Sequence, residues 1–133
     1  MSPLRVVAGV LVRQGRVLAA RRPAHKAQGG LWELPGGKVE DGETDAAALA
    51  RELREELGVE VQVGETLAQN LHAYPARAVL LVALRCELLA GEEPRAHEHD
   101  DLRWVDAAGL DGLPWAPADL PLLPAVRGIL AGG

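Results

Sequence analysis

The stretch GKVEDGETDAAALARELREELGV, residues 37–59, decides the fold, because it predicts a glycine-containing loop followed by one amphipathic helix. Thr44 is placed to cap the start of this helix, and Gly58 supplies a stop at its end. The apolar residues between them recur every four positions, at Leu49, Leu53 and Leu57. The helix is therefore predicted to run from Thr44 to Leu57 with its leucine face buried.

The charged residues of this helix separate by sign. At about 100° of rotation per residue, one flank of the leucine stripe carries three glutamates, Glu52, Glu55 and Glu56. Arg51 and Arg54 fall on the opposite flank. Carboxylates one turn apart repel each other unless something neutralises them. Because Mg²⁺ prefers oxygen ligands and binds a few carboxylates together with substrate phosphates, the acidic flank predicts a hard-cation site.

A solvated acidic flank is the alternative explanation of these glutamates. The residues before the helix argue against it. The segment PGGK, residues 35–38, ends a short predicted strand. Glycine lets backbone groups approach an ion or a phosphate where a side chain would obstruct them. We therefore expect this loop and the acidic flank to form one site.

The composition limits the class of protein. The chain has 133 residues, of which 48% are hydrophobic and 25% charged, the balance of one ordinary globular domain. Its formal net charge of -5 argues against a nucleic-acid polymer as ligand, since polyanions need a basic face. No apolar run approaches the roughly 18 residues of a spanning helix, and no targeting segment is recognisable. We expect a cytoplasmic protein that contacts no membrane and is a monomer or homodimer.

Strands and two helices interleave along the sequence without a regular βαβ period. Gln14-Gly15 suits a tight turn between the first two strands, and Pro121 and Pro124 suit the first turn of a C-terminal helix. The predicted strands cover residues 5–12, 16–21, 59–63, 77–88 and 101–105. We expect an α+β fold, an α/β/α sandwich around a mixed β-sheet, with residues 1–133 as a single domain.

Residues 37–59 also resemble the Nudix box. The segment GKVEDGE, seven further residues and RELREELGV match every defined position of that motif. At average residue frequencies, chance agreement at all of these positions is on the order of one in 10⁹ per starting point. The sequence is therefore identified as a member of the Nudix hydrolase superfamily. This resemblance implies the Nudix fold, with the box forming a loop, helix and loop that hold a divalent metal.

The resemblance implies a role for each charged residue of the box. Mg²⁺ is the implied cofactor, with Mn²⁺ as the alternative. The implied metal ligands are the Gly36 carbonyl and the side chains of Glu52, Glu55, Glu56 and Glu98. Glu43 and Arg51 are implied to brace the loop against the helix, and either Glu52 or Glu98 to orient or deprotonate the attacking water. A phosphoanhydride is shielded by negative charge, so its hydrolysis needs metal neutralisation, a positioned water and a general base.

Beyond the box, the sequence is similar to the MutT branch of the family. The similarity is carried by LWELPGG at residues 31–37, AHEH at 96–99 and APADLPLL at 116–123, the last resembling bacterial CTP pyrophosphohydrolases. It implies hydrolysis of a nucleoside triphosphate to the monophosphate and pyrophosphate. Where the MutT archetype reads the base with asparagine, this sequence has Asp119. An ionised Asp119 only accepts hydrogen bonds, which favours cytosine with its amine, whereas a protonated Asp119 donates one and keeps an oxidised purine such as 8-oxo-dGTP open.

Other residues are candidates for the walls of the substrate site. Three basic residues are candidates for phosphate binding, Arg22, Lys38 and Arg77. Leu34 is a candidate pocket wall, since ligand sites are mostly apolar. Glu98 lies between His97 and His99, and we interpret both histidines as polar loop residues.

Two further functions stay open on the same fold. One is hydrolysis of a nucleoside diphosphate derivative such as ADP-ribose, although the short chain and the segment around Asp119 favour the triphosphate. The other is a non-catalytic Nudix-fold module that only binds nucleotides. Such a module can lose its carboxylates, whereas Glu52, Glu55 and Glu56 are all present here. The sequence therefore favours an enzyme.

Overall fold

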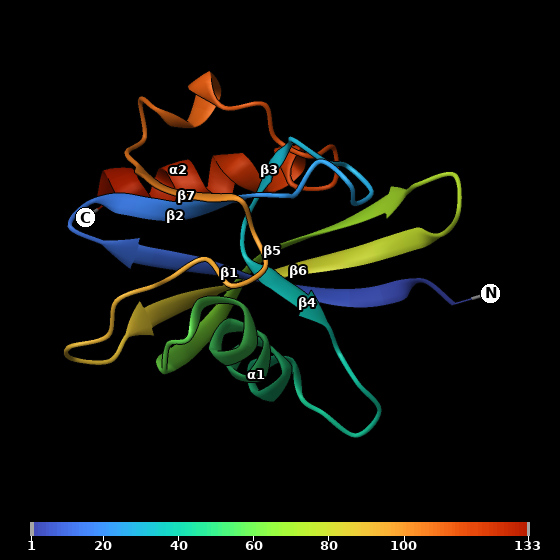
Figure 1. The fold of residues 1–133 in the computed structure, drawn as a ribbon, viewed down its shortest axis with the longest axis horizontal. Coiled ribbons are helices and arrows are strands. Elements are labelled where there is room, and N and C mark those ends of the chain that lie inside the picture. Colours follow the sequence, from blue (N-terminus) through green and yellow to red (C-terminus); the bar gives the residue numbers. More distant parts are fainter. Residues whose placement is uncertain (1, 133) are drawn as a thin grey trace.

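The fold is built on one seven-stranded sheet with a helix on each side (Figure 1). The computed structural model describes residues 2–132. The strands are β1 (Leu4–Arg13), β2 (Arg16–Arg21), β3 (Trp32–Glu33), β4 (Gly36–Lys38), β5 (Val61–Ala73), β6 (Ala78–Leu88) and β7 (Asp101–Val105). The helices are α1 (Asp45–Leu57) and α2 (Leu123–Gly132), with 3-10 turns η1 (Leu110–Gly112) and η2 (Leu120–Leu122). Within residues 2–132, none of the helices is both long enough and apolar enough to span a membrane.

The centre of the sheet is a parallel pair, β1 and β6, in the strand order β3-β2-β1-β6-β5. The other pairs are antiparallel, including β4 on β1 and β7 on β2. The predicted mixed sheet is therefore confirmed. The predicted turn joins β1 and β2, where Gln14 (φ 53°) and Gly15 (φ 74°) both adopt the left-handed conformation that such a hairpin needs.

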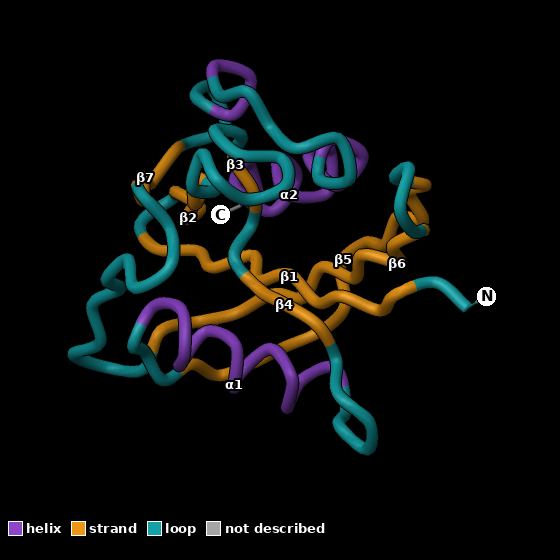
Figure 2. The backbone as a smooth tube through the Cα atoms, turned by 45° about the vertical axis from the view of Figure 1, so that its right-hand side comes forward, coloured by secondary structure: helices purple, strands orange, loops and turns teal. Residues whose placement is uncertain are grey.

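The helices α1 and α2 cover opposite faces of the sheet (Figure 1 and Figure 2). Thr44 caps the start of α1, as predicted. Residues of β1 alternate between the two faces: Val7 and Leu11 pack in one core cluster with the leucines of α1. Ala8 and Val10 belong to the second cluster, which α2 completes. Because successive strand residues point to opposite faces, one strand supplies both cores, and the expected α+β sandwich is confirmed.

The edge strand β5 is longer than predicted. The sequence predicts a strand over residues 59–63, whereas β5 continues to Ala73. Most of its residues alternate between partly buried and exposed, since β5 is paired only on one side, with β6. Polar residues on the exposed face of an edge strand leave no continuous hydrophobic run to recognise. The extension matters because it carries the β5–β6 hairpin to the side of the candidate site.

Candidate active site

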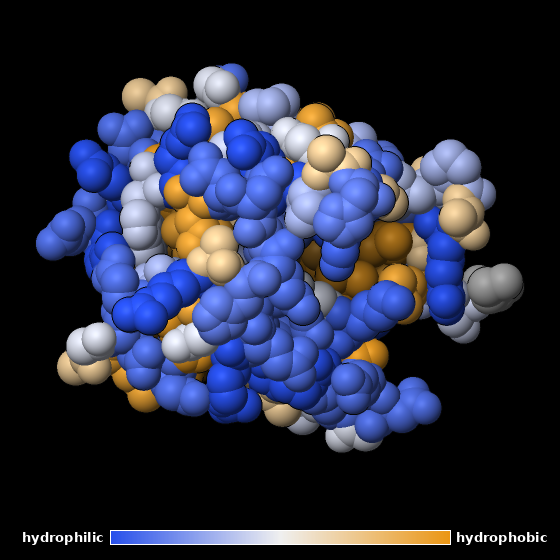
Figure 3. All heavy atoms as spheres, viewed as in Figure 1, coloured by the Kyte–Doolittle hydropathy of each residue, from blue (hydrophilic) through white to orange (hydrophobic). Residues whose placement is uncertain are grey.

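A cavity of about 770 Å³ opens beside the sheet, with walls from β1, the β3–β4 segment, α1 and the β5–β6 hairpin. Figure 3 shows it as a recess with an apolar floor, right of centre. The predicted site residues that line it are Arg22, Leu34, Gly36, Lys38, Glu52, Glu56, Arg77, Glu98 and Asp119. The predicted residues that do not line it are Glu43, Arg51 and Glu55. The fold thus gathers residues from the whole length of the chain around one cavity.

Two glycines of β4 allow the acidic side chains to pack against the sheet. A Cβ added at Gly37 would collide with the Glu52 carboxylate. A Cβ added at Gly36 would collide with the Val7 carbonyl of the neighbouring strand. Gly36 is therefore needed for the close approach of β4 to β1, and Gly37 leaves the space that the Glu52 carboxylate fills.

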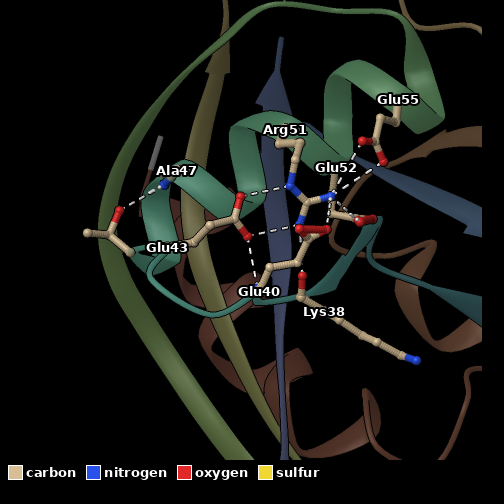
Figure 4. Close-up of polar contacts among 8 residues, drawn as sticks. Lys38, Glu40, Glu43, Ala47, Arg51, Glu52 and Glu55 are labelled. Atoms are coloured by element: carbon tan, nitrogen blue, oxygen red, sulfur yellow. Dashed lines mark hydrogen bonds and ion pairs between the residues drawn. The ribbon is translucent and has the colours of Figure 1, made fainter.

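Arg51 lies at the centre of a group of carboxylates from α1 and the loop before it (Figure 4). Its Nε and Nη2 donate to the two carboxylate oxygens of Glu43 at 2.8 and 3.0 Å, and Nη2 also donates to the Lys38 carbonyl at 3.0 Å. Its Nη1 donates to Glu52 Oε1 at 2.9 Å. The hydrogen bonds from Arg51 lower the pKa of Glu43 to about 2. Arg51 thus ties the loop to the helix and orients Glu52.

The expected separation of Arg51 from the glutamates of α1 is wrong. The sequence predicts Arg51 on the flank opposite the glutamates, but its guanidinium bonds Glu52 and lies 3.4 Å from Glu55, because residues four positions apart lie on the same side of a helix. The side chain of Glu55 is 56% exposed, against 17% for Glu52 and 6% for Glu56. Glu55 is therefore the solvent-facing member of the three predicted carboxylate ligands.

A buried group of three side chains lies at the inner end of the acidic wall. His99 Nε2 lies 2.8 Å from Glu33 Oε2 and 3.6 Å from Glu56 Oε1. His99 lies in a loop, as interpreted, but its side chain is only 4% exposed and contacts two carboxylates, which the sequence did not predict. Sequence reasoning also missed Glu33. Its signal is the alternation in WEL, residues 32–34, where two buried apolar residues flank a glutamate that faces the cavity.

The environment of Glu56 fits a cation. Burial, together with the nearby charges of Glu33 and Glu52, raises the pKa of Glu56 to about 10. Among residues 2–132, no lysine or arginine forms an ion pair with Glu56, and His99 Nδ1 is buried without a hydrogen-bond partner. A buried carboxylate is costly to ionise unless a positive charge approaches it. The oxygen-rich donor set suits a hard divalent ion.

Glu98 is brought to the cavity by a loop fastened to the end of α1. The Arg95 N–H donates to the Leu57 carbonyl at 3.0 Å, and the His97 N–H donates to the Glu56 carbonyl at 3.1 Å. The His97 ring adds a third bond, from Nδ1 to the Glu55 carbonyl at 3.2 Å. The carbonyls at the end of a helix have no partner within the helix. The loop therefore satisfies them and in doing so fixes the position of the next residue, Glu98.

Asp119 lies at the other end of the cavity and is almost fully buried, with 4% exposure. Its Oδ2 accepts a hydrogen bond from the Leu34 N–H at 2.9 Å. Burial raises the pKa of Asp119 to about 8. The preceding Ala118 N–H donates to the Tyr74 hydroxyl at 3.1 Å, which ties this segment to the β5–β6 hairpin. The cavity thus has an apolar end with one buried carboxyl group that faces it.

The basic residues of the cavity are held by their own contacts. Arg22 donates from Nε to the Ala27 carbonyl at 2.7 Å and from Nη1 to Glu33 at 3.2 Å. Arg77 is exposed, with one hydrogen bond to the Ser2 carbonyl at 3.4 Å. Together with Lys38 they give the cavity positive charge near the acidic wall. Such an arrangement suits an anionic ligand that is bound together with a divalent cation.

A family model described as the NUDIX domain matches residues 6–125 of the chain. The chain belongs to the Nudix family. Members of this family generally need a divalent metal, in agreement with the buried acidic cluster of Glu33, Glu56 and His99. The Nudix box corresponds to β4, α1 and the loop between them, and this segment forms one wall of the cavity.

Similar proteins include named Nudix enzymes of nearly the same length. CTP pyrophosphohydrolase from Escherichia coli (strain K12) is 44% identical over 131 residues, covering 98% of this chain and 96% of that protein. An 8-oxo-dGTP diphosphatase from the same strain is 29% identical over 128 residues, covering 96% and 98%. The solution structure of the E. coli ORF135 protein superimposes with a TM-score of 0.85 and 41% identity, covering 99% of this chain and 94% of that one. The chain is therefore a Nudix hydrolase, as its sequence indicates.

Proposed function

We propose that this Nudix hydrolase cleaves a nucleoside triphosphate to the monophosphate and pyrophosphate with the help of Mg²⁺, as in MutT-type removal of unwanted nucleotides. The observation that carries the proposal is the cavity itself, which has buried carboxylates on one wall and the buried Asp119 at its apolar end. Similarity to a CTP pyrophosphohydrolase and an 8-oxo-dGTP diphosphatase supports a triphosphate.

The metal would be held by the acidic wall. The proposed ligands are the Gly36 carbonyl and the carboxylates of Glu52, Glu55, Glu56 and Glu98, with Mn²⁺ able to replace Mg²⁺. When bound, the metal supplies charge neutralisation of the phosphates and a more acidic water. Glu55 is solvent-facing in this structure, so its side chain would turn toward the cavity on binding. Exposed glutamates change rotamer readily, and the contact with Arg51 is long at 3.4 Å.

The chain's own groups would orient the substrate and take the proton. Glu52 is held by Arg51 at 2.9 Å and packed against Gly37. We assign Glu52 as the general base: the water oxygen bonds to phosphorus and its proton passes to the Glu52 carboxylate. The P–O bond between the α- and β-phosphates breaks with its electron pair on the former bridging oxygen, which releases the monophosphate and pyrophosphate. Glu98, on its anchored loop, would complete the ligand set.

Phosphate and base would be bound at different parts of the cavity. Arg22, Lys38 and Arg77 are the proposed phosphate-binding residues, and Leu34 is the proposed wall beside the base. Asp119 would read the base edge. As a carboxylate it would accept from the amine of cytosine, and as a neutral acid it would donate to an oxidised purine.

The rest of the proposal concerns the state of the protein. Residues 1–133 would act as one domain, in the cytoplasm, as a monomer or homodimer. The net charge of -5 disfavours a nucleic-acid polymer as partner, so the proposed partner is a small nucleotide.

The proposed function is tested by pyrophosphate release with Mg²⁺ from 8-oxo-dGTP, dGTP, CTP, dCTP, 5-methyl-dCTP and ADP-ribose. Glu55→Gln should lower the rate by about 100-fold. Glu60→Gln is the matched control, because Glu60 is 48% exposed, pairs with Arg54 and does not line the cavity. Cleavage of ADP-ribose to two monophosphates with no triphosphate cleaved would overturn the substrate class. Turnover of no compound would favour a nucleotide-binding module.

A further inference from the structure

We propose that His99 is a positioning residue whose imidazole holds the carboxylates of Glu33 and Glu56 in fixed places, and so links the phosphate side of the cavity to the metal side. The proposal rests on the proposed function in one respect, that Glu56 is a metal ligand. The Nudix box contains neither His99 nor Glu33.

The His99 ring makes its polar contacts through one nitrogen, Nε2. Nε2 faces two carboxylate oxygens, at 2.8 Å in Glu33 and 3.6 Å in Glu56. The 2.8 Å contact is a hydrogen bond to the Glu33 carboxylate oxygen, which accepts, so we place the hydrogen on Nε2. Nδ1 is buried and has no hydrogen-bond partner in the described part of the chain. The polar contacts of the ring therefore all lie on the side of the two glutamates.

The contacts of His99 with Glu33 and Glu56 are shielded from water. The side chains of His99, Glu33 and Glu56 are 4%, 17% and 6% exposed. Metal binding requires Glu56 as a carboxylate, and two carboxylates whose oxygens lie within 4.8 Å of each other repel strongly away from water. A donor between them fixes their separation, and its removal leaves them free to move apart. His99 makes its hydrogen bond to Glu33 at 2.8 Å and lies 3.6 Å from Glu56. Loss of a neighbouring group that orients a metal ligand typically lowers metal affinity by about 10- to 100-fold.

Glu33 extends the link to the phosphate side. Its carboxylate also receives Arg22 Nη1, at 3.2 Å and 3.4 Å to the two oxygens. Arg22 Nε is fixed by the Ala27 carbonyl at 2.7 Å. Contacts therefore run from Arg22 through Glu33 and His99 to Glu56. His99 is the member of this series that contacts two carboxylates, Glu33 through a hydrogen bond and Glu56 at 3.6 Å.

The first test is Mn²⁺ affinity, measured without nucleotide by electron paramagnetic resonance of the free ion. His99→Leu should weaken Mn²⁺ binding by about 10-fold or more. His99→Gln should restore most of the affinity, because the glutamine amide presents an N–H close to the position of Nε2. His25→Gln, in an exposed loop position that does not line the cavity, should leave the affinity unchanged. Circular dichroism and the thermal midpoint show whether each variant is folded.

The second measurement separates positioning from direct ligation. Pulsed electron paramagnetic resonance of bound Mn²⁺ detects a coordinated imidazole nitrogen, and we expect no such coupling in the unaltered protein. A nitrogen coupling that disappears in His99→Leu, or a glutamine variant as weak as the leucine one, would show that His99 is a ligand and overturn the proposal. Equal affinity in the unaltered protein and His99→Leu would overturn it too. Normal Mn²⁺ binding without hydrolysis of any triphosphate would instead contradict only the proposed function.

Discussion

A Cβ atom added at Gly58 would lie 2.9 Å from Cε1 of His97, so the residue that ends α1 also leaves the space in which the His97 ring lies. Gly58 has φ 67°, the left-handed conformation of a helix C-cap. The His97 ring in turn bonds the Glu55 carbonyl. The glycine therefore has two tasks: it ends the helix, and it admits the loop that carries Glu98.

Gly58→Ala should destabilise the protein more than an alanine substitution at another glycine of positive φ that has no side chain close by. Gly91→Ala is the matched control, because Gly91 has φ 83° and a Cβ there would meet nothing within 4 Å. Both changes carry the left-handed penalty of about 1–2 kcal/mol. Displacement of the His97 ring, which is bonded to the Glu55 carbonyl, should add about 1 kcal/mol at Gly58, measured by urea unfolding. Equal losses in the two variants would mean that the loop moves aside without cost.

The acidic flank could be predicted because its signals are local. Leucine spacing, the cap at Thr44 and the stop at Gly58 all lie within one segment. The pairing of Glu33 with His99 could not be predicted, because 66 positions separate them. They meet only because β2 pairs with both β3 and β7, so that one residue, Arg21, lies opposite both strands. No local pattern encodes this double pairing.

The end of the cavity around Asp119 could be predicted only in part from the sequence. Asp119 stood out by resemblance, but its bond to the Leu34 N–H joins residues 85 positions apart. The role of Tyr74 was missed, because it depends on the part of β5 that the sequence did not predict. Residues held by backbone groups of distant segments give no signal in their own neighbourhood.

Glu56→Gln should stabilise the metal-free protein while abolishing its response to metal. Burial raises the pKa of Glu56 to about 10, so folding near neutral pH must protonate this side chain, and a neutral amide of the same size removes that cost. We expect a gain of about 1–2 kcal/mol in the free energy of unfolding without metal. Mg²⁺ should raise the thermal midpoint of the unaltered protein and not that of the variant.

The control for this comparison is Glu52→Gln. Glu52 accepts a hydrogen bond from Arg51 at 2.9 Å, so its charge is already compensated, and its neutralisation should bring no gain in stability. If both glutamine variants gained equally, general relief of negative charge on the helix would explain the result, and the buried environment of Glu56 would not.

Arg51→Lys should lower turnover while it leaves the fold intact. Arginine bonds Glu43, Glu52 and the Lys38 carbonyl at the same time, and a lysine ammonium cannot reproduce that planar fork. We expect kcat to fall by about 10-fold or more, with a small change in the thermal midpoint. Arg54→Lys is the control, because Arg54 pairs with Glu60 outside the site.

The same variant should alter acid stability in a defined direction. Arg51 lowers the folded-state pKa of Glu43 to about 2, from an ordinary value of 4.5. A depressed pKa contributes stability that is present above pH 4.5 and is lost as the pH falls through 2. The stability difference between the unaltered protein and Arg51→Lys should therefore shrink between pH 4.5 and pH 2, as measured by urea unfolding. A constant difference would show that the Glu43 carboxylate does not depend on Arg51.

Asp119→Asn should become relatively more stable as the pH rises. Burial raises the folded-state pKa of Asp119 to about 8, from an ordinary value of 3.8, and the groups around it are the Leu34 N–H, Glu33 and Arg22, with Tyr74 close by. The neutral acid is thus the form that folding favours. Its contribution to stability is complete below pH 3.8 and is lost as the pH rises through 8.

Asparagine keeps an oxygen that accepts from the Leu34 N–H and cannot ionise. The variant therefore does not lose stability at this position as the pH rises. Relative to the unaltered protein, its free energy of unfolding should rise by several kcal/mol, on the order of 5, between pH 4 and pH 8, measured by urea unfolding at several pH values. Asp111→Asn, at an aspartate whose side chain is 82% exposed, should show no such trend. A flat difference for Asp119→Asn would mean that Asp119 is ionised at neutral pH, and the acceptor needed to read a cytosine amine would then be present without any change of protonation.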